Sequence, residues 1–401
     1  MGNNQRSVTL YLASVPAVSV IISLAFLGSV FTATDSLHAK PWELGLLGAA
    51  VTGTYALFCP IFGRLLRRAD IRRRAIAVCV MYLLVGALAP VLKSLWLLTA
   101  LIAFLGFAGA LYWPMVEGVV CEGRAGAEVR RVLGTFNVLW CGGTTAGTLL
   151  AGPLYDLHPN LPFHVALGLA AIVLVLFLLT PSPHAPGSAG AAAGPPNHEE
   201  AGVPAEVAGS FLYLSKVMVF LAYFTYGSLR ALFPKYGTQL GFSATIVSIL
   251  LFMTVLAQTG VFLLFRNTGF WHYRYWPLLV TTAAAAASFF AIGSVSSVPL
   301  LAVLFVCIGL FLGCSYFSSI YYSMARPKAG VESAAWHEMT LGTGTTLGPI
   351  VAGLFAQQTG SLAAPFMLSG AVAVIGLGIA VQFFLRRVRI WAPPGGDGAG
   401  K

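Results

Sequence analysis

Residues 143–152 read GTTAGTLLAG, and residues 344–353, about half a chain later, read GTTLGPIVAG. Six of the ten aligned positions are identical, and both copies lie in apolar, glycine-rich segments. Internal repeats in a strongly apolar chain are typical of proteins built from two related helix bundles with a binding site between them. The repeat therefore predicts two equivalent halves.

The composition around this repeat is that of an integral membrane protein. Apolar residues make up 58% of the 401 residues and charged residues only 9%, whereas soluble domains have roughly 45–50% and about 25%. The apolar runs are about 18–25 residues long, which is the length of a membrane-spanning helix. A membrane barrel would instead show alternating segments of about ten residues. The sequence therefore predicts an all-α membrane protein embedded in a lipid bilayer.

The pattern predicts twelve membrane spans in two groups of six. They are expected near residues 8–32, 42–63, 75–92, 95–120, 132–154, 162–180, 211–233, 243–265, 275–294, 298–324, 334–357 and 362–385. Residues 182–210 are rich in Ala, Gly and Pro, as in a flexible linker. The predicted domains are therefore an N-terminal bundle (1–181), a cytosolic linker (182–210) and a C-terminal bundle (211–401).

The net charge of +10 reflects topology and gives no reason to expect a nucleic-acid partner. With both termini in the cytosol, most Lys and Arg fall in cytosolic loops, and the outer side keeps only Lys40, Lys93, Arg230 and Lys235. This asymmetry follows the positive-inside rule. It predicts a multi-pass protein of the plasma (inner) membrane.

The sequence shows none of the residue patterns that are typical of catalytic sites or metal sites. No nucleophile–base set, His-Glu-x-x-His pattern or nucleotide-binding P-loop occurs. The six cysteines lie in or at the ends of apolar helices, and none forms a Cys-x-x-Cys pair with a nearby His. We therefore expect no enzymatic activity, no cofactor, no metal and no disulfide.

Three local patterns point to a family. Residues 63–74, GRLLRRADIRRR, are similar to the loop signature Gly-x-Leu-x-Asp-Arg-x-Gly-Arg-Arg, but Arg67 stands at the acidic position and Asp70 is a displaced acid. The span over 132–154 is similar to the antiporter motif Gly-x8-Gly-x3-Gly-Pro-x2-Gly-Gly with Thr148 in place of Pro, whereas the span over 334–357 keeps Pro349. The spacing Glu117-x6-Arg124 is similar to a pair in sugar porters.

In these motifs the chain resembles the major facilitator superfamily of secondary transporters. The resemblance covers the whole chain and implies two six-helix bundles related by a pseudo-two-fold axis, with substrate bound between them. It also implies a monomer, possible membership of the drug/proton-antiporter type, and gating by the 63–74 loop through Gly63, Asp70 and Arg72. Close helix packing is expected from small residues of the repeat, namely Gly143, Gly147, Gly152, Gly344, Gly348 and Gly353, with a kink at Pro349.

Few polar groups fall inside the spans, and such groups usually face a cavity or each other. A proton-coupled transporter needs a group that titrates in the physiological range, and the candidates are Glu338, His337 and Glu117. Glu338 could instead pair with Arg326 or Lys328 as an inner gate. Glu117 could instead pair with Arg130, Arg131 or the arginine loop.

A second set of residues could line the substrate cavity. The repeat aligns Asn137 with Glu338, and aromatic walls suit amphipathic organic substrates. Arg230 could bind an anionic substrate, pair with Asp35 or Glu43, or snorkel to the outer surface. The predicted cavity residues are Asn137, Trp140, Tyr112, Trp113, Arg230, Gln258, Tyr316 and Phe317.

The leading functional hypothesis is a secondary transporter that moves a small organic molecule by alternating access, coupled to protons and directed outward. An alternative is a permease for uptake of a sugar or organic anion. A different class remains open, a non-transporting membrane sensor or assembly protein on the same scaffold.

Overall fold

The computed structural model describes residues 3–65, 70–121, 127–179, 203–324 and 331–387, and these residues form twelve α-helices and one short 3-10 helix with no strand. The first half contains α1 (Asn3–Asp35), α2 (Pro41–Leu65), α3 (Ile71–Leu88), η1 (Ala89–Val91), α4 (Leu95–Cys121), α5 (Ala127–Leu157) and α6 (Leu161–Leu179). The second half contains α7 (Ala205–Gln239), α8 (Ala244–Asn267), α9 (Trp276–Ile292), α10 (Val298–Met324), α11 (Val331–Thr359) and α12 (Ala364–Arg387). The predicted all-α class and the twelve helices are confirmed.

Ten of the described helices are long and apolar enough to cross a membrane, and α9 is a shorter apolar helix. Helix α5 is not among the ten, because Asn137 and several Gly and Thr residues lower its mean hydropathy. Helix α7 starts at Ala205, so residues 205–210, expected in the linker, form its first turns.

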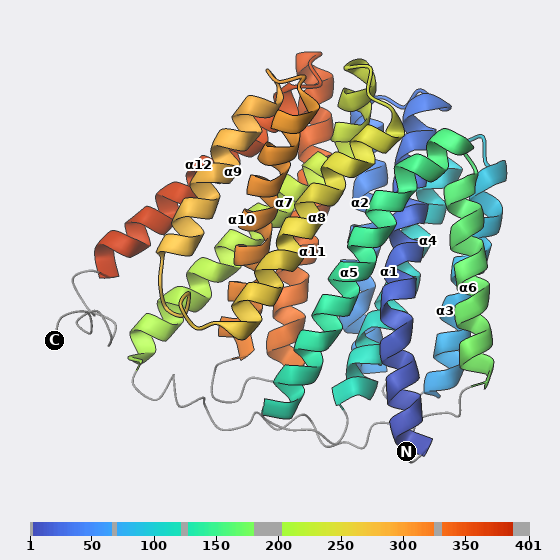
Figure 1. Cartoon of the computed structure of the whole chain (residues 1–401), viewed down its shortest axis with the longest axis horizontal. Coiled ribbons are helices and arrows are strands. Elements are labelled where there is room, and N and C mark those ends of the chain that lie inside the picture. The colour runs from blue at the N-terminus through green and yellow to red at the C-terminus, as the bar shows by residue number, and fades with distance from the viewer. Residues whose placement is uncertain (1–2, 66–69, 122–126, 180–202, 325–330, 388–401) are drawn as a thin grey trace.

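The helices of the two halves pair in the same way. In the first half α1 packs on α5, α2 on α4 and α3 on α6, and six helices later α7 packs on α11, α8 on α10 and α9 on α12. Between the halves, α2 runs along α11 and α5 along α8 (Figure 1). This repeated pairing is the structural counterpart of the repeat in the sequence.

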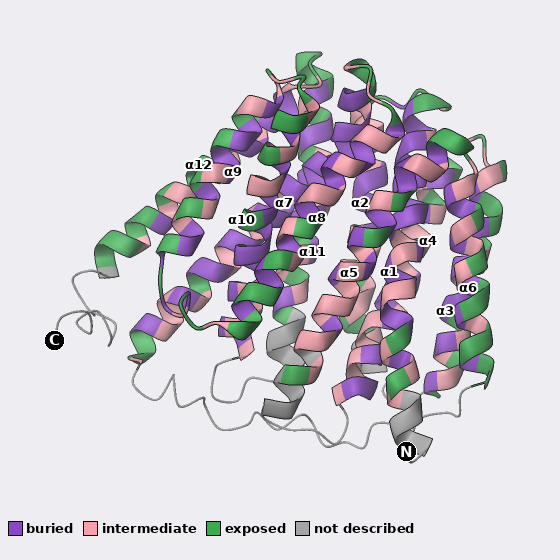
Figure 2. Ribbon diagram, viewed as in Figure 1, coloured by how far each residue is buried: buried purple, intermediate pink, exposed green. Residues whose placement is uncertain are grey.

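We call the end of the molecule where α6 stops and α7 starts the linker end, and the opposite end, where α1 leads into α2, the far end (Figure 1). Buried residues concentrate where the helices face one another, and exposed ones follow the outer faces of peripheral helices such as α6 and α12 (Figure 2). The exposed residues of these outer faces include many large apolar ones, among them Ile172, Leu179, Ile375 and Leu385, as expected where lipid is the solvent.

The repeated glycines lie where helices approach each other closely. A Cβ at Gly147 of α5 would lie 2.7 Å from the Ser23 side chain of α1, and one at Gly344 of α11 would lie 2.5 Å from the Phe220 carbonyl of α7. Both distances are shorter than atoms tolerate, so only glycine permits these helix contacts. Each copy thus allows an equivalent pair of helices to pack closely within its own half.

The last glycine of each copy has a different partner. A Cβ at Gly152 would clash with the Ala244 carbonyl of α8, and one at Gly353 would lie 2.6 Å from the Pro41 carbonyl of α2. Pro349 fits between α2 and α7, because Cβ atoms built at Gly48 and Gly227 would lie 3.2 and 3.0 Å from its ring. These contacts bring the two halves together at the far end.

Candidate functional site

Two carboxylates from opposite halves lie close together in the half of the molecule nearer the linker end. Glu338 stands on α11, and the Tyr55 hydroxyl of α2 donates a hydrogen bond to its Oε2 at 3.4 Å. Glu117 of α4 lies within electrostatic range of Glu338. All three side chains are half-buried. We call Tyr55, Glu117 and Glu338 the carboxylate cluster.

Among the described residues, no basic side chain forms an ion pair with these carboxylates. The one ion pair within 4.0 Å there joins Asp70 to Arg73. Arg131 is exposed, and Arg326, Lys328 and the side chain of Arg130 lie outside the described residues. Within the described part of the chain, Glu117 lies near a second acid, Glu338, and forms no ion pair with Arg131.

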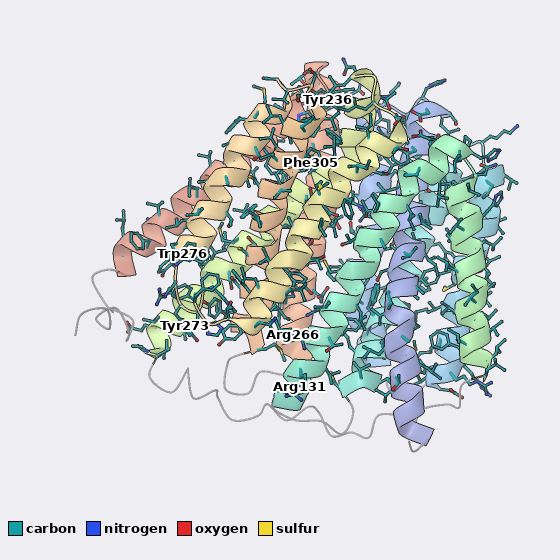
Figure 3. All side chains as sticks on the ribbon, in the orientation of Figure 1. Arg131, Tyr236, Arg266, Tyr273, Trp276 and Phe305 are labelled. Carbon is teal, nitrogen blue, oxygen red and sulfur yellow. The ribbon has the colours of Figure 1, made fainter. Side chains whose placement is uncertain are left out.

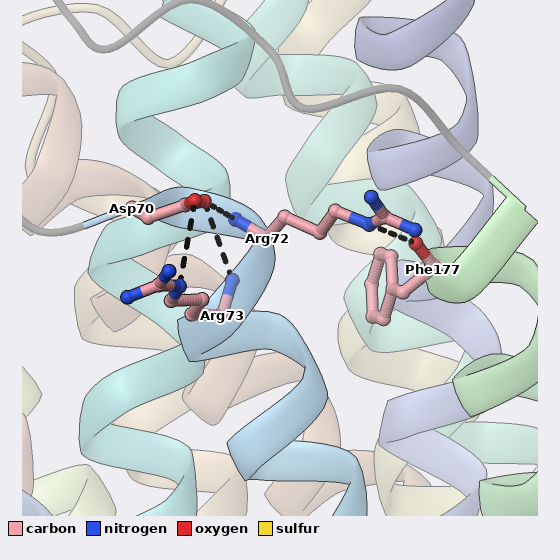
Figure 4. Close-up of polar contacts among 4 residues, drawn as sticks. All are labelled: Asp70, Arg72, Arg73 and Phe177. Atoms are coloured by element: carbon pink, nitrogen blue, oxygen red, sulfur yellow. Dashed lines mark hydrogen bonds and ion pairs between the residues drawn. The ribbon is translucent and has the colours of Figure 1, made fainter.

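Asp70 and Arg72, two of the residues through which the 63–74 loop was expected to gate transport, make their contacts within the first half (Figure 4). Asp70 caps α3, where it accepts hydrogen bonds from the backbone N–H groups of Arg72 at 2.8 Å and Arg73 at 3.4 Å. The Arg72 guanidinium donates to the carbonyls of Phe177, at 3.3 Å, and Leu178 at the end of α6. Gly63 lies in the last turn of α2, and its surroundings lie outside the described residues.

His337 faces a different direction from its neighbour Glu338. Its Nδ1 lies 2.9 Å from the Ser319 hydroxyl of α10, and its ring packs edge-on against Tyr316 at 4.8 Å. The imidazole is fully buried. His337 therefore fastens α11 to α10 within the second half, and the carboxylate alone faces the first half.

Aromatic rings connect the halves between the carboxylate cluster and the far end. Trp140 of α5 stacks on Tyr316 of α10, with centroids 5.9 Å apart and planes 23° apart. Tyr223 of α7 lies 6.0 Å from Tyr316 and 6.1 Å from Tyr226, and its hydroxyl accepts a hydrogen bond from Gln258 at 2.9 Å. We call Trp140, Tyr316, Tyr223 and Tyr226 the aromatic strip.

Arg230 stands one turn beyond Tyr226 on α7. Its guanidinium carbon lies 3.9 Å from the centroid of the Phe26 ring of α1, across the boundary between the halves. Neither Asp35 nor Glu43, the two partners considered from the sequence, forms an ion pair with it in the described structure. The side chain is half-buried.

Three of the expected cavity residues contribute mainly to packing. Tyr112 is fully buried and shares a hydrogen bond of 2.7 Å with Ser14, which joins α4 to α1 inside the first half. Trp113 packs edge-on against Phe136 of α5 at 5.9 Å. Phe317 lies among the rings of α8, at 5.9 Å from both Phe262 and Phe265. The half-buried Asn137 lies on α5.

A polar contact at the far end was not foreseen from the sequence. The Asp156 carboxylate, at the end of α5, accepts hydrogen bonds from the first backbone N–H groups of α8, Ala244 at 3.2 Å and Thr245 at 2.8 Å. On the other side of the same end, Lys235 Nζ of α7 donates to the Ala39 carbonyl at 2.7 Å. Both contacts join the first half to the second.

Threonines of the repeat make matching contacts halfway along the interface. The hydroxyls of Thr145 on α5 and Thr259 on α8 lie 3.2 Å apart, and those of Thr346 on α11 and Thr52 on α2 also lie 3.2 Å apart. Thr145 and Thr346 occupy the same position of the repeat. The two helix pairs that join the halves are thus related by the repeat.

This arrangement of two equivalent six-helix halves with polar groups between them can be compared with known proteins. The family model of the major facilitator superfamily matches residues 11–335. The chain belongs to this superfamily.

Solved structures of superfamily transporters share the fold. The crystal structure of the nucleoside transporter NupG is 13% identical, with a TM-score of 0.71 over 94% of this chain and 99% of that one. A bacterial homologue of the human lysosomal transporter Spinster, inward-facing and occupied, is 14% identical, with a TM-score of 0.66 over 98% and 100%. None of the curated proteins matches the chain significantly.

Membership of the superfamily makes this protein a membrane transporter of a small-molecule solute and not an enzyme. The similarity to these structures, at 13% and 14% identity, is one of fold. The superfamily fold places the binding site between the halves, where the carboxylate cluster, the aromatic strip and Arg230 lie.

Proposed function

We propose that the protein is a proton-coupled secondary transporter that carries a small organic solute by alternating access. The observation that supports this proposal is the carboxylate cluster. Glu117 and Glu338 come from opposite halves, lie within electrostatic range of each other, and have no Lys or Arg within 4.0 Å among the described residues.

The chemistry of two neighbouring carboxylates suggests how a proton could be coupled to movement. Two carboxylates in one site repel each other when both are ionised, and one shared proton removes the repulsion. A proton on the pair therefore favours approach of α4 and α11 at the linker end, and its loss favours their separation. Such a difference between two conformations is what binding must supply to shift their populations.

The groups around the cluster are suited to this role because the described ones carry no fixed charge. Tyr55 and Cys59 of α2 face the carboxylates, and Tyr316 of α10 and Tyr223 of α7 lie within electrostatic range of Glu338. They can stabilise either protonation state by hydrogen bonding without fixing one. A permanent salt bridge, in contrast, would hold the carboxylate ionised.

We assign the linker end to the cytosol and the far end to the outside of the plasma membrane. Arg131 and Arg266 mark the linker ends of α5 and α8 (Figure 3), and cytosolic loops are enriched in such residues. On this orientation, the contacts of Asp156 and Lys235 close the outer end. We propose a monomer, and this orientation corresponds to both termini in the cytosol.

We propose outward transport, by exchange for protons, on the similarity of the repeated glycine motif to the antiporter motif. The orientation of the driving gradient tests this direction. An inside-acidic gradient in a right-side-out vesicle should slow export of a preloaded compound, whereas it should drive export in a symporter.

The experiment that tests the proposed coupling uses the Glu338→Gln variant in proteoliposomes. A compound that stabilises the purified protein in a thermal-shift screen serves as the labelled solute. We expect gradient-driven accumulation to be lost, because glutamine cannot exchange a proton, whereas counterflow exchange should persist. Glu43→Gln, a carboxylate at the far end, is the matched control. Undiminished gradient-driven accumulation in Glu338→Gln would show that Glu338 is not the coupling residue.

A further inference from the structure

Arg230 is a cation inside the boundary between the halves whose charge no described residue balances. It lies nine residues before Gln239, the last residue of α7, about 14 Å along the helix at 1.5 Å per residue. The guanidinium rests on the Phe26 ring and lies near Tyr226. Intramembrane cations that are neither paired nor at the interface are costly and are typical of functional sites.

The acidic residues of the far end are occupied by other groups. Glu43 accepts a hydrogen bond of 2.7 Å from the Lys40 backbone N–H. Asp35 accepts a hydrogen bond from the Tyr155 hydroxyl, and Asp156 caps α8. Among the described residues, none of these acids lies within 4.0 Å of a nitrogen of Arg230. Its N–H donors are therefore available to a ligand.

The buried aromatic rings next to Arg230 suit an organic body. Tyr223, Tyr226 and Arg230 follow one another on one face of α7, since positions three and four apart on a helix are neighbours. Tyr223 continues to Tyr316, and Tyr316 stacks on Trp140 of the other half. The cation at one end of this site attracts an anionic group of a ligand, and the aromatic rings along its side favour contact with an apolar group.

We infer that the transported solute is an organic anion, whose carboxylate or phosphate group binds Arg230 and whose apolar or aromatic body lies along the aromatic strip. Arginine matches both anionic groups with two parallel hydrogen bonds, and rings supply the apolar contact area that organic ligands bury. This inference rests on the proposed function, because it takes the boundary between the halves as the solute route. It makes Arg230 a specificity-determining residue.

The test measures binding of matched acid and neutral pairs to the purified full chain by isothermal titration calorimetry. The probes are 2-naphthoate with 2-naphthamide, 2-naphthyl phosphate with 2-naphthol, and decanoate with decanamide. At least one acid is expected to bind at least 10-fold more tightly than its neutral twin. Comparison of the carboxylates with the phosphate identifies the preferred anionic group.

Variants assign that preference to Arg230. Arg230→Gln should remove the difference between acid and neutral twin without weakening the neutral compound, and Arg230→Lys should keep part of it, because a point charge remains. Lys235→Gln is the matched control. It removes a cation of the same helix that is bound to the Ala39 carbonyl, and it should leave the acid-to-neutral ratio unchanged.

The inference is overturned if neutral twins bind as tightly as acids, if no acid binds to the folded protein, or if Arg230→Gln keeps the preference. These outcomes are separate from failure of the proposed function, since binding is measured without a gradient. A protein that binds only neutral compounds and still accumulates them under a proton gradient would refute the anion assignment alone. Loss of coupling with an intact, Arg230-dependent preference for acids would refute the proton assignment alone.

Discussion

Asp156 holds the far end closed, and replacing it with alanine should open that end. Its carboxylate satisfies the backbone N–H groups of Ala244 and Thr245 at the start of α8, from the other half of the molecule. When the far ends of α5 and α8 separate, both hydrogen bonds must break. Ser243 caps the same helix from within, through the Ile246 N–H, so α8 keeps a cap when Asp156 is absent.

The size of the effect follows from these contacts. Loss of a side-chain cap at a helix N-terminus costs about 0.5–2 kcal/mol, and loss of a carboxylate from the positive end of the helix dipole costs about 0.3–1 kcal/mol. Asp156 is exposed, so solvent screening keeps the sum to about 1–2 kcal/mol. Since about 1.4 kcal/mol is a tenfold change, the equilibrium constant for opening at the far end should rise by about 5- to 30-fold.

The assay is double electron–electron resonance, which measures the distance between two spin labels. The labels are placed at two exposed far-end positions, Leu157 of the first half and Gln239 of the second. The labels are attached to introduced cysteines in a protein whose six native cysteines are replaced. Asp156→Ala should increase the population at long distance. Glu43→Gln, an acid at the same end that bonds within its own half, should not. An unchanged distance distribution in Asp156→Ala would refute the assignment of Asp156 as a contact that closes this end.

Two further predictions concern the repeat. Gly147→Ala should lower thermal stability, because the added methyl meets Ser23 at 2.7 Å, whereas Gly142→Ala on the same helix has nothing within 4 Å of its methyl and should be neutral or stabilising by up to about 1 kcal/mol. A thermal-shift measurement compares them, and equal effects would contradict the packing argument. Thr346→Val should loosen the contact of α11 with Thr52 and raise exchange rates in counterflow, whereas Thr343→Val, an exposed threonine bonded to its own helix, should leave them unchanged.

The sequence was a good guide to the fold because lipid imposes simple requirements on a chain. Every backbone polar group must be satisfied internally, so apolar runs of helix length become helices, and the twelve predicted spans correspond to α1–α12. Glycine pairs such as Gly143 and Gly147 could be identified as contact points, since small residues four apart create a flat helix face. The partner helix could not be identified from this pattern.

Side-chain direction explains why the site was harder to predict. His337 and Glu338 are adjacent in sequence, but successive residues on a helix point about 100° apart, so one faces α10 and the other faces α2. Tyr112 and Tyr316 lie on the equivalent helices α4 and α10, yet the first bonds to Ser14 within its half and the second contacts Trp140 across the halves. A repeat preserves positions on helices but does not preserve partners.

The sequence by itself determined the membrane environment, the number of helices and the equivalence of the halves, because these depend on local composition and on the repeat. Only the tertiary structure decided that Glu117 lies near Glu338, that Arg230 rests on Phe26, and that Asp156 caps α8. Each of these contacts joins residues of different halves. Their proximity depends on how the two bundles pack against each other, which no local pattern in the sequence encodes.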